Sequence, residues 1–228
     1  MSLFAIADLH LSLGCDKPMD VFSGWQNYTE RLEKNWRAVV GRDDTVVIAG
    51  DISWAMNLEE AVNDFSFIHS LPGKKLILKG NHDYWWSTKK KIVEFLERNG
   101  LNTIQIIHNN AVVVGDIAVC GTRGWLYNAE TEEDVKIVNR EVGRLNASID
   151  DAERQGAKPV VFLHYPPVYD GAVCKEILTV LKERGIQKCY FGHIHGSQAA
   201  RRAMTGEYEG IKMVLISCDY LNFMPVLV

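Results

Sequence analysis

Short apolar runs recur along the chain, and several are apolar at nearly every position. Val160-Val161-Phe162-Leu163 is one of these, and such a run is typical of a strand whose two faces are both covered. Gly115-Asp116 joins two runs that alternate apolar and polar positions, and this pair predicts a tight hairpin turn. The runs that predict strands are Leu3–Ala7, Thr45–Ala49, Lys75–Leu78, Thr103–Ile107, Ala111–Val114, Ile117–Cys120, Pro159–Leu163, Lys188–Phe191 and Met213–Ser217.

Between these runs lie segments in which apolar residues recur every three or four positions, as on one face of a helix. The longest segment carries Val138, Leu145 and Ile149 on such a stripe. A helix packed on a sheet and a short coiled-coil contact both give this stripe, and we favour core packing. The predicted helices are Trp25–Val40, Leu58–His69, Thr88–Arg98, Glu132–Gln155 and Val173–Arg184.

The order of these elements predicts an α/β fold with a layered core and an antiparallel section in the middle. No low-complexity linker, internal repeat or change in composition divides the 228 residues. The whole chain, residues 1–228, is therefore expected to form a single domain.

Composition and charge disfavour several classes of function. The formal net charge of −4 provides no field that would gather nucleic acid or an anionic membrane. No apolar run approaches the roughly 20 residues of a membrane span, and Met1-Ser2 leads into the first strand without the basic flank of a signal peptide. The five cysteines include no Cys-X-X-Cys pair, so buried free thiols and a cytoplasmic, reducing location are expected.

Five of the predicted strands are followed, within three residues of their last position, by Asp, His or Asn. In open α/β sheets, ligands bind in the crevice beyond the carboxyl ends of the strands, so these side chains are expected to meet in one site. The residues are Asp8, His10, Asp51, Asn81, His82, Asp83, His164, His193 and His195.

Taken singly, most of these motifs carry little information, because Asp-X-His and Gly-Asp are common in turns. Gly80-Asn81-His82-Asp83 is more specific, with a glycine that permits a tight turn. His193 and His195 lie two residues apart, and this spacing places both rings on one side of an extended segment. The five motifs in this order predict a functional site, whereas His69 and His108 stand alone and are interpreted as structural or exposed.

The donor types indicate transition metals. Two aspartates, one asparagine and four histidines, without a thiolate, suit Mn, Fe, Zn or Ni better than Ca or Mg, which prefer oxygen alone. These donors exceed what one tetrahedral zinc takes but suit two divalent ions that share a carboxylate. Two ions about 3.5–4 Å apart can hold a hydroxide between them and clamp a phosphoryl group.

The ordered set of motifs, Asp-Leu-His, Gly-Asp, Gly-Asn-His-Asp, His-Tyr-Pro and Gly-His-Ile-His, resembles the calcineurin-like metallophosphoesterase superfamily. The resemblance spans most of the chain and implies a four-layer αββα sandwich of two mixed sheets flanked by helices, with a dinuclear metal site at the strand ends. The resemblance implies that one ion is held by Asp8, His10 and His195, and a second by Asn81, His164 and His193. Asp51 would bridge the two ions. His82 would lie beside the phosphate without binding a metal.

The chain departs from the superfamily pattern in two motifs and has no obvious cap insertion. Trp54 stands where relatives often carry a second aspartate that orients the histidine of the Gly-Asn-His motif. Asp83 is a candidate substitute for that aspartate. Leu163 replaces the glycine expected before His164, which changes the backbone but not the ligand.

Two further features near the motifs carry alternative interpretations. Arg123, after a predicted strand, is either a substrate contact, since its fork fits phosphate oxygens, or a loop-ordering salt bridge. Tyr84, Trp85 and Trp86 either stack on a base or ring of the substrate or wedge the turn against the next helix, and we favour the wedge.

We therefore expect a metal-dependent hydrolase of phosphate mono- or diesters that acts on a small phosphorylated substrate, with nucleotides among the candidates. The alternatives are a non-catalytic scaffold of the same fold and a nuclease built on the same core. Every ligand position is filled, which disfavours the scaffold, and the acidic net charge disfavours a nucleic-acid polymer as partner. The sequence predicts no particular oligomeric state.

Overall fold

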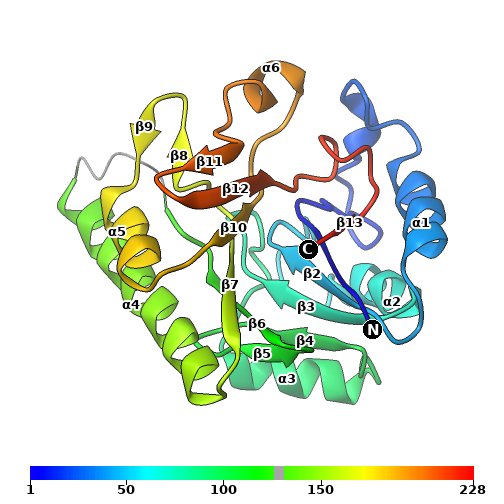
Figure 1. Ribbon diagram of the computed structural model, residues 1–228. Helices are drawn as coiled ribbons and strands as arrows, with labels where there is room; N and C mark the ends of the chain where they lie inside the picture. Colours follow the sequence, from blue (N-terminus) through cyan, green and yellow to red (C-terminus); the bar gives the residue numbers. More distant parts are fainter. Residues whose placement is uncertain (126–130) are drawn as a thin grey trace.

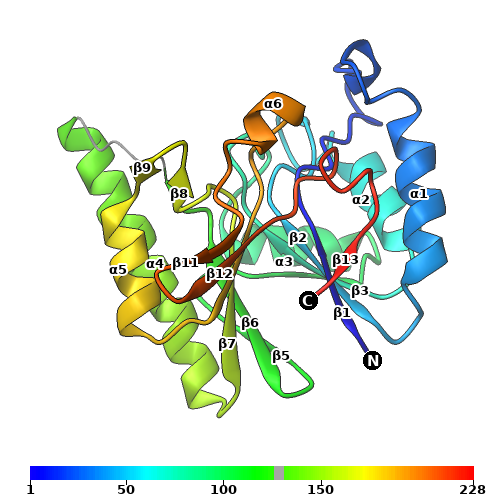
Figure 2. The same ribbon diagram turned by 45° about the horizontal axis from the view of Figure 1, so that its top comes forward.

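The computed structural model describes residues 1–125 and 131–228. It has four layers, in which helices cover the outer face of each of two large mixed sheets (Figure 1). Figure 2 shows α4 and α5 on one side of the strands and α1 on the opposite side. The expected αββα sandwich is confirmed.

The first sheet has the strand order β13-β1-β2-β3-β4, and only the edge strand β13 runs antiparallel to its neighbour. Its strands are β1 (Leu3–Ile6), β2 (Thr45–Ala49), β3 (Lys74–Leu78), β4 (Ile104–Ile106) and β13 (Val226–Leu227). The helices that pack on its outer face are α1 (Tyr28–Val39), α2 (Val62–Ser70) and α3 (Lys89–Arg98).

The second sheet has the order β11-β12-β10-β7-β6-β5, with a parallel centre and antiparallel edges. Its strands are β5 (Val112–Val114), β6 (Ile117–Thr122), β7 (Lys158–Leu163), β10 (Lys188–Phe191), β11 (Gly206–Tyr208) and β12 (Ile211–Leu215). Its covering helices are α4 (Glu132–Arg154) and α5 (Lys175–Glu183). The smaller elements are the 3-10 turn η1 (Met19–Val21), the hairpin β8 (Val168–Tyr169) and β9 (Ala172–Val173), and α6 (Ser197–Ala200).

The stripe of the longest helix belongs to the core. Val138, Leu145 and Ile149 of α4 are buried against the second sheet, so core packing is confirmed over a coiled-coil contact. The helix begins after Thr131, whose side chain accepts a hydrogen bond from the amide of Asp134 in a capping box, an arrangement that satisfies otherwise unpaired amides.

The inner faces of the two sheets pack against each other through mostly small and aliphatic side chains. Ala5 and Ala49 of the first sheet belong to the same buried cluster as Val119 and Phe162 of the second. The sheets are also joined by backbone hydrogen bonds beyond β1 and β12, where Ala7 N donates to Ile216 O (2.8 Å) and Cys218 N donates to Ala7 O (2.9 Å). The carboxyl ends of strands from both sheets are thereby fixed beside one another.

The main differences from the sequence prediction lie in short elements and helix starts. The pairs β8–β9 and the edge strands β11 and β13 were not predicted, because two or three residues carry too little periodicity. Helix α1 begins at Tyr28 rather than Trp25, and α2 at Val62 rather than Leu58. The hairpin turn at Gly115-Asp116 is confirmed by the antiparallel pairing of β5 with β6. No helix in the described part of the chain is both long and apolar enough to cross a membrane.

Gly121, in β6, provides a test of how closely the sheets approach. A Cβ atom there would meet Phe162 O at 1.9 Å and Leu78 Cδ2, from the first sheet, at 2.6 Å. We expect Gly121→Ala to lower the free energy of unfolding by about 1–3 kcal/mol. Gly143→Ala is the matched control, because a Cβ on that exposed face of α4 meets nothing within 4 Å and alanine favours the helix by about 1 kcal/mol. Urea unfolding of both variants checks this, and equal stability of the two would contradict the packing.

Candidate metal centre

The predicted ligands come from strand ends in both sheets. Asp8 and His10 follow β1, Asp51 follows β2 and Asn81 follows β3, while the second sheet supplies His164 after β7 and the two histidines after β10. Several of these residues adopt left-handed backbone conformations, which cost energy for any residue but glycine and cluster at functional sites. Their φ angles are 61° at Asp8, 46° at His10, 50° at Asp51 and 71° at His193.

The first group consists of Asp8, His10 and His195, each of which offers a ligand atom within 4.8 Å of the others. The Nε2 atoms of His10 and His195 face each other at 3.2 Å. On the other side of the His195 ring, Nδ1 lies 3.0 Å from Asp219 Oδ1. Asp219 also accepts a hydrogen bond from the backbone amide of Gly196. A carboxylate in this position fixes the ring and leaves Nε2 for a metal ion.

The second group consists of Asp51, His164 and His193, and Asn81 adjoins it. His164 Nε2 lies 2.6 Å from Asn81 Oδ1, and His164 Nδ1 lies 3.2 Å from the backbone oxygen of Ala49. That oxygen can only accept, so a hydrogen on Nδ1 satisfies it. His164 Nε2 and Asn81 Oδ1 then face each other as two acceptors, as two ligands of one cation do.

Asp51 lies between the two groups. Its Oδ2 is 3.4 Å from His164 Nε2 and 3.7 Å from His10 Nε2. Its other oxygen, Oδ1, accepts the backbone amide of His82 at 2.7 Å. One oxygen therefore faces both groups while the second is fixed by the backbone, as a bridging carboxylate requires.

Burial sets the protonation of the histidines. It lowers the pKa of His164 and of His193 to about 3, so both rings are neutral, which is the form that binds metal. His195 differs: burial lowers its pKa, but the hydrogen bond to Asp219 and the charge of Asp8 outweigh burial and raise it to about 9.

Burial also acts on the carboxylates. It raises the pKa of Asp8 to about 8, against the opposing charge of His195, and it raises the pKa of Asp51. Buried carboxylates without a nearby cation favour the neutral form, and a divalent ion reverses that preference. The donor set, the neutral imidazoles of His164 and His193 and the buried carboxylates fit divalent transition-metal ions, and an ion in the first group would take the place of the proton on His195.

His82 stands beside the two groups with its ring held by aromatic neighbours. Trp54 lies 4.4 Å from the His82 ring and stacks on His10 at 4.9 Å, measured between ring centroids. Tyr84 Oη lies 3.4 Å from His82 Nδ1. Trp54 thus packs against the ring that, by the resemblance noted in the sequence, an aspartate at this position would orient.

The suggestion that Asp83 orients the His82 ring is corrected. Asp83 is buried and accepts the amides of Asp51 (3.0 Å), Ile52 (2.8 Å) and Gly80 (2.7 Å). Burial, and next the charge of Asp51, raise its pKa to about 7, while these amide donors oppose the rise. Its role in the structure is to tie the turn after β2 to the turn after β3.

The aromatic residues after Asp83 divide between the two interpretations. Trp85 is buried, donates its Nε1 hydrogen to Asp83 and packs edge-on against Phe65 at 4.9 Å. It therefore wedges the turn against the helical layer, as favoured from the sequence. Tyr84 is 50% exposed and stays at the surface beside His82.

The substrate-contact interpretation of Arg123 stays a prediction, and the contacts of this side chain agree with the loop-ordering alternative. Its guanidinium lies over the Trp125 ring at 4.7 Å and 3.9 Å from Glu141 Oε1, and it lines a small separate cavity. The backbone oxygen of Arg123 accepts the amides of His164 (3.1 Å) and Tyr165 (2.8 Å), so this loop positions a predicted ligand.

Sequence reasoning assigned no role to Asp219 and did not identify Glu141. Asp219 carries the same signal as the predicted ligands, an acidic residue just after a strand, and only its distance of 3.0 Å to His195 reveals its role. Glu141 lies in α4, is fully buried and bonds Arg144 at 2.7 Å. No local pattern distinguishes it from a surface glutamate.

A comparison with protein families matches residues 1–197 to the family described as Calcineurin-like phosphoesterase. Among individual sequences, the chain is 40% identical over 58 residues to the Gene 66 protein of Mycobacterium phage L5. That match covers 25% of this chain and 28% of the phage protein, so the chain spans less than a third of that relative.

Solved structures share the fold at low sequence identity. Phosphopantetheinyl hydrolase from Mycobacterium tuberculosis aligns with a TM-score of 0.58 and 12% identity, over 100% of this chain and 95% of that protein. A protein of unknown function from Aquifex aeolicus aligns with a TM-score of 0.56 and 13% identity, over 99% of this chain and 95% of that one.

Two carboxylates near the site should respond differently to substitution. In Asp83→Asn an NH₂ group replaces one carboxylate oxygen, so the backbone amides that donated to that oxygen lose their acceptor. We expect the free energy of unfolding to fall by about 3 kcal/mol. Asp219→Asn should lower it by less than about 1 kcal/mol, because its pair with His195 is partly exposed, but should weaken metal retention. Urea unfolding of the metal-free variants and metal analysis after loading check this. Similar losses of unfolding free energy in both variants would contradict the role of Asp83 in tying the two turns together.

Proposed function

Because the chain belongs to the calcineurin-like phosphoesterase family, we propose that it hydrolyses a small phosphate ester with the help of two divalent transition-metal ions. The observation that carries the proposal is the position of Asp51 Oδ2, 3.4 Å and 3.7 Å from histidine nitrogens of the two ligand groups. A single carboxylate oxygen that faces two such groups supports a shared bridge.

Each ligand group has its own task. Asp8, His10 and His195 would hold one ion; the residues that would hold the second are Asn81, His164 and His193, and Asp51 would serve both. When bound, two such ions act as Lewis acids on phosphoryl oxygens and supply a water nucleophile at neutral pH. Imidazole-rich coordination favours Mn, Fe, Zn or Ni.

His82 would act on the leaving group. Its ring lines the same cavity as His10 and His195, and its backbone amide is anchored by Asp51. From there the ring can donate a hydrogen bond to charge that develops on the phosphoryl group, or protonate the departing alkoxide. Trp54 keeps the ring directed into the cavity.

Neither alternative function has an observation that favours it over hydrolysis. The seven donor positions are filled and brought together, whereas a scaffold has no need to retain them. A nuclease requires a basic surface to hold the phosphate backbone, and no lysine or arginine is among the described residues that line the cavity beside the site.

Metal content tests the bridge. After loading with Mn²⁺, wild type should retain about two ions per chain, and Asp51→Asn should lose both more metal and more activity than Asn81→Ala, because it removes the shared charge. Asp116→Asn, in the exposed hairpin turn, should match wild type. Elemental analysis and phosphoesterase assays measure both quantities. Saturation of wild type at one ion, or near-normal turnover of Asp51→Asn, would contradict the assignment.

Substitution of His82 tests its role. His82→Ala should retain metal while kcat falls by about 100- to 10,000-fold. If the ring protonates the leaving group, the loss should shrink for p-nitrophenyl esters, whose leaving group needs no proton. If the ring stabilises charge, both ester types should lose rate alike, and His82→Gln, which keeps a donor, should recover part of it. Loss of a metal ion in His82→Ala would contradict both roles.

A further inference from the structure

A cavity of about 400 Å³ adjoins the candidate metal centre. His10, His82 and His195 line part of it, and most of the remaining lining is apolar. The apolar side chains are Met19, Phe22, Trp25 and Trp54, and Trp25 and Trp54 also contact the His10 ring. The volume falls within the range of about 300–1,000 Å³ that is typical of small-molecule sites.

Charged side chains are scarce in the lining of this cavity. No lysine or arginine is among its lining residues in the described part of the chain, and Asp219, the only carboxylate there, is paired with His195 at 3.0 Å. Lys17 Nζ sits over the Trp54 ring at 4.9 Å. A second phosphate or a carboxylate placed against the apolar side chains would therefore lose hydration without a matching cation among the described lining residues, since Lys17 is exposed to solvent and is not one of them.

The apolar wall is held in place by contacts of its own. Trp25 meets the Phe223 ring edge-on at 5.2 Å and the Tyr28 ring at 5.6 Å. Trp54 Nε1 donates to the sulfur of Met19 at 3.3 Å. These side chains are fixed before any substrate arrives, which lowers the entropic cost of binding.

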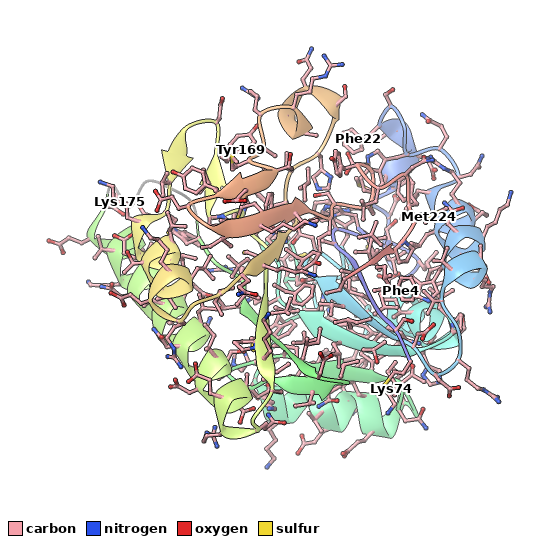
Figure 3. All side chains as sticks on the ribbon, viewed as in Figure 1. Phe4, Phe22, Lys74, Tyr169, Lys175 and Met224 are labelled. Carbon is pink, nitrogen blue, oxygen red and sulfur yellow. The ribbon has the colours of Figure 1, made fainter. Side chains whose placement is uncertain are left out.

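Phe22 differs from the rest of the wall. It follows η1 on the segment between β1 and α1 and is 55% exposed, and Figure 3 places it at the outer edge of the molecule. A large apolar ring left in water beside a functional cavity gains free energy when a ligand covers it.

On this basis, and resting on the proposed phosphoesterase function, we propose that the cavity binds the leaving group of the substrate and selects an uncharged, apolar one. His82, the residue expected to act on the departing oxygen, lines the same cavity as Phe22 and Met19. A phosphoryl group held by the histidines thus has its leaving group within the same cavity, beside these apolar side chains. The substrate class is an ester of phosphate with an alcohol or phenol that carries an apolar, uncharged body.

A matched series of leaving groups tests this. Phenol, 4-propylphenol and 3-(4-hydroxyphenyl)propionate are of similar acidity but differ in apolar surface and charge. Their phosphate esters, prepared as monoesters and as methyl diesters, are assayed with Mn²⁺-loaded protein. We expect kcat/KM for the propylphenyl ester to exceed that for the phenyl ester by about 10-fold, and the carboxylated ester to be the poorest.

The Phe22→Ala variant should bring the ratio of propylphenyl to phenyl kcat/KM to within about twofold of 1. Val21→Ala is the matched control, because Val21 is 73% exposed and is not among the lining residues, and its ratio should equal that of wild type. An equal ratio in wild type and Phe22→Ala, or a preference for the carboxylated ester, would overturn the proposal.

A binding measurement separates this proposal from the proposed function. Calorimetric titration of metal-free protein with 4-propylphenol should show binding with a negative heat-capacity change, the mark of apolar burial, and Phe22→Ala should weaken it. If no ester is hydrolysed but 4-propylphenol binds in this way, the phosphoesterase function fails and the apolar cavity stands. If esters are hydrolysed without preference and 4-propylphenol does not bind, the cavity proposal fails alone.

Discussion

The close approach of the turn after β2 to the turn after β3 is the constraint on which the site depends. A Cβ atom on Gly80 would lie 2.1 Å from Asp51 Oδ1, so only glycine lets the two turns meet. Asp83 then fixes them by accepting amides from both. The result is an Asp51 side chain with one oxygen held by the backbone of His82 and the other facing both ligand groups.

Much of the fold and the ligand set followed from the sequence, because both depend on local patterns. Continuous apolar runs identified the central strands, and the polar residues after them identified the ligand groups that the structure brings together. Contacts between distant segments were beyond that reasoning. Arg123 meets Glu141 from α4, and Trp54 packs on His82 across 28 positions of sequence that carry no periodic signal for the pairing. The strands of two or three residues were missed for a different reason, since they are too short to show a period.

The departure at Trp54 links stability, orientation and specificity. Its indole stacks on His10, supports His82 and forms part of the apolar wall. An aspartate there would place a charge in that wall and a hydrogen-bond acceptor beside the imidazole. With an indole in place of a carboxylate, position 54 both packs against the imidazole rings and contributes apolar surface for the proposed leaving group. The buried carboxylates meanwhile leave the candidate metal centre dependent on cations for its charge balance.

The central claim is that Asp51 is shared by two metal ions, and anomalous diffraction from crystals of the Mn²⁺-loaded protein tests it most directly. The account predicts two anomalous peaks about 3.5–4 Å apart, one beside His10 and His195, the other beside His164 and His193, with an Asp51 oxygen in contact with both. A single peak, or two peaks of which only one touches Asp51, would contradict it.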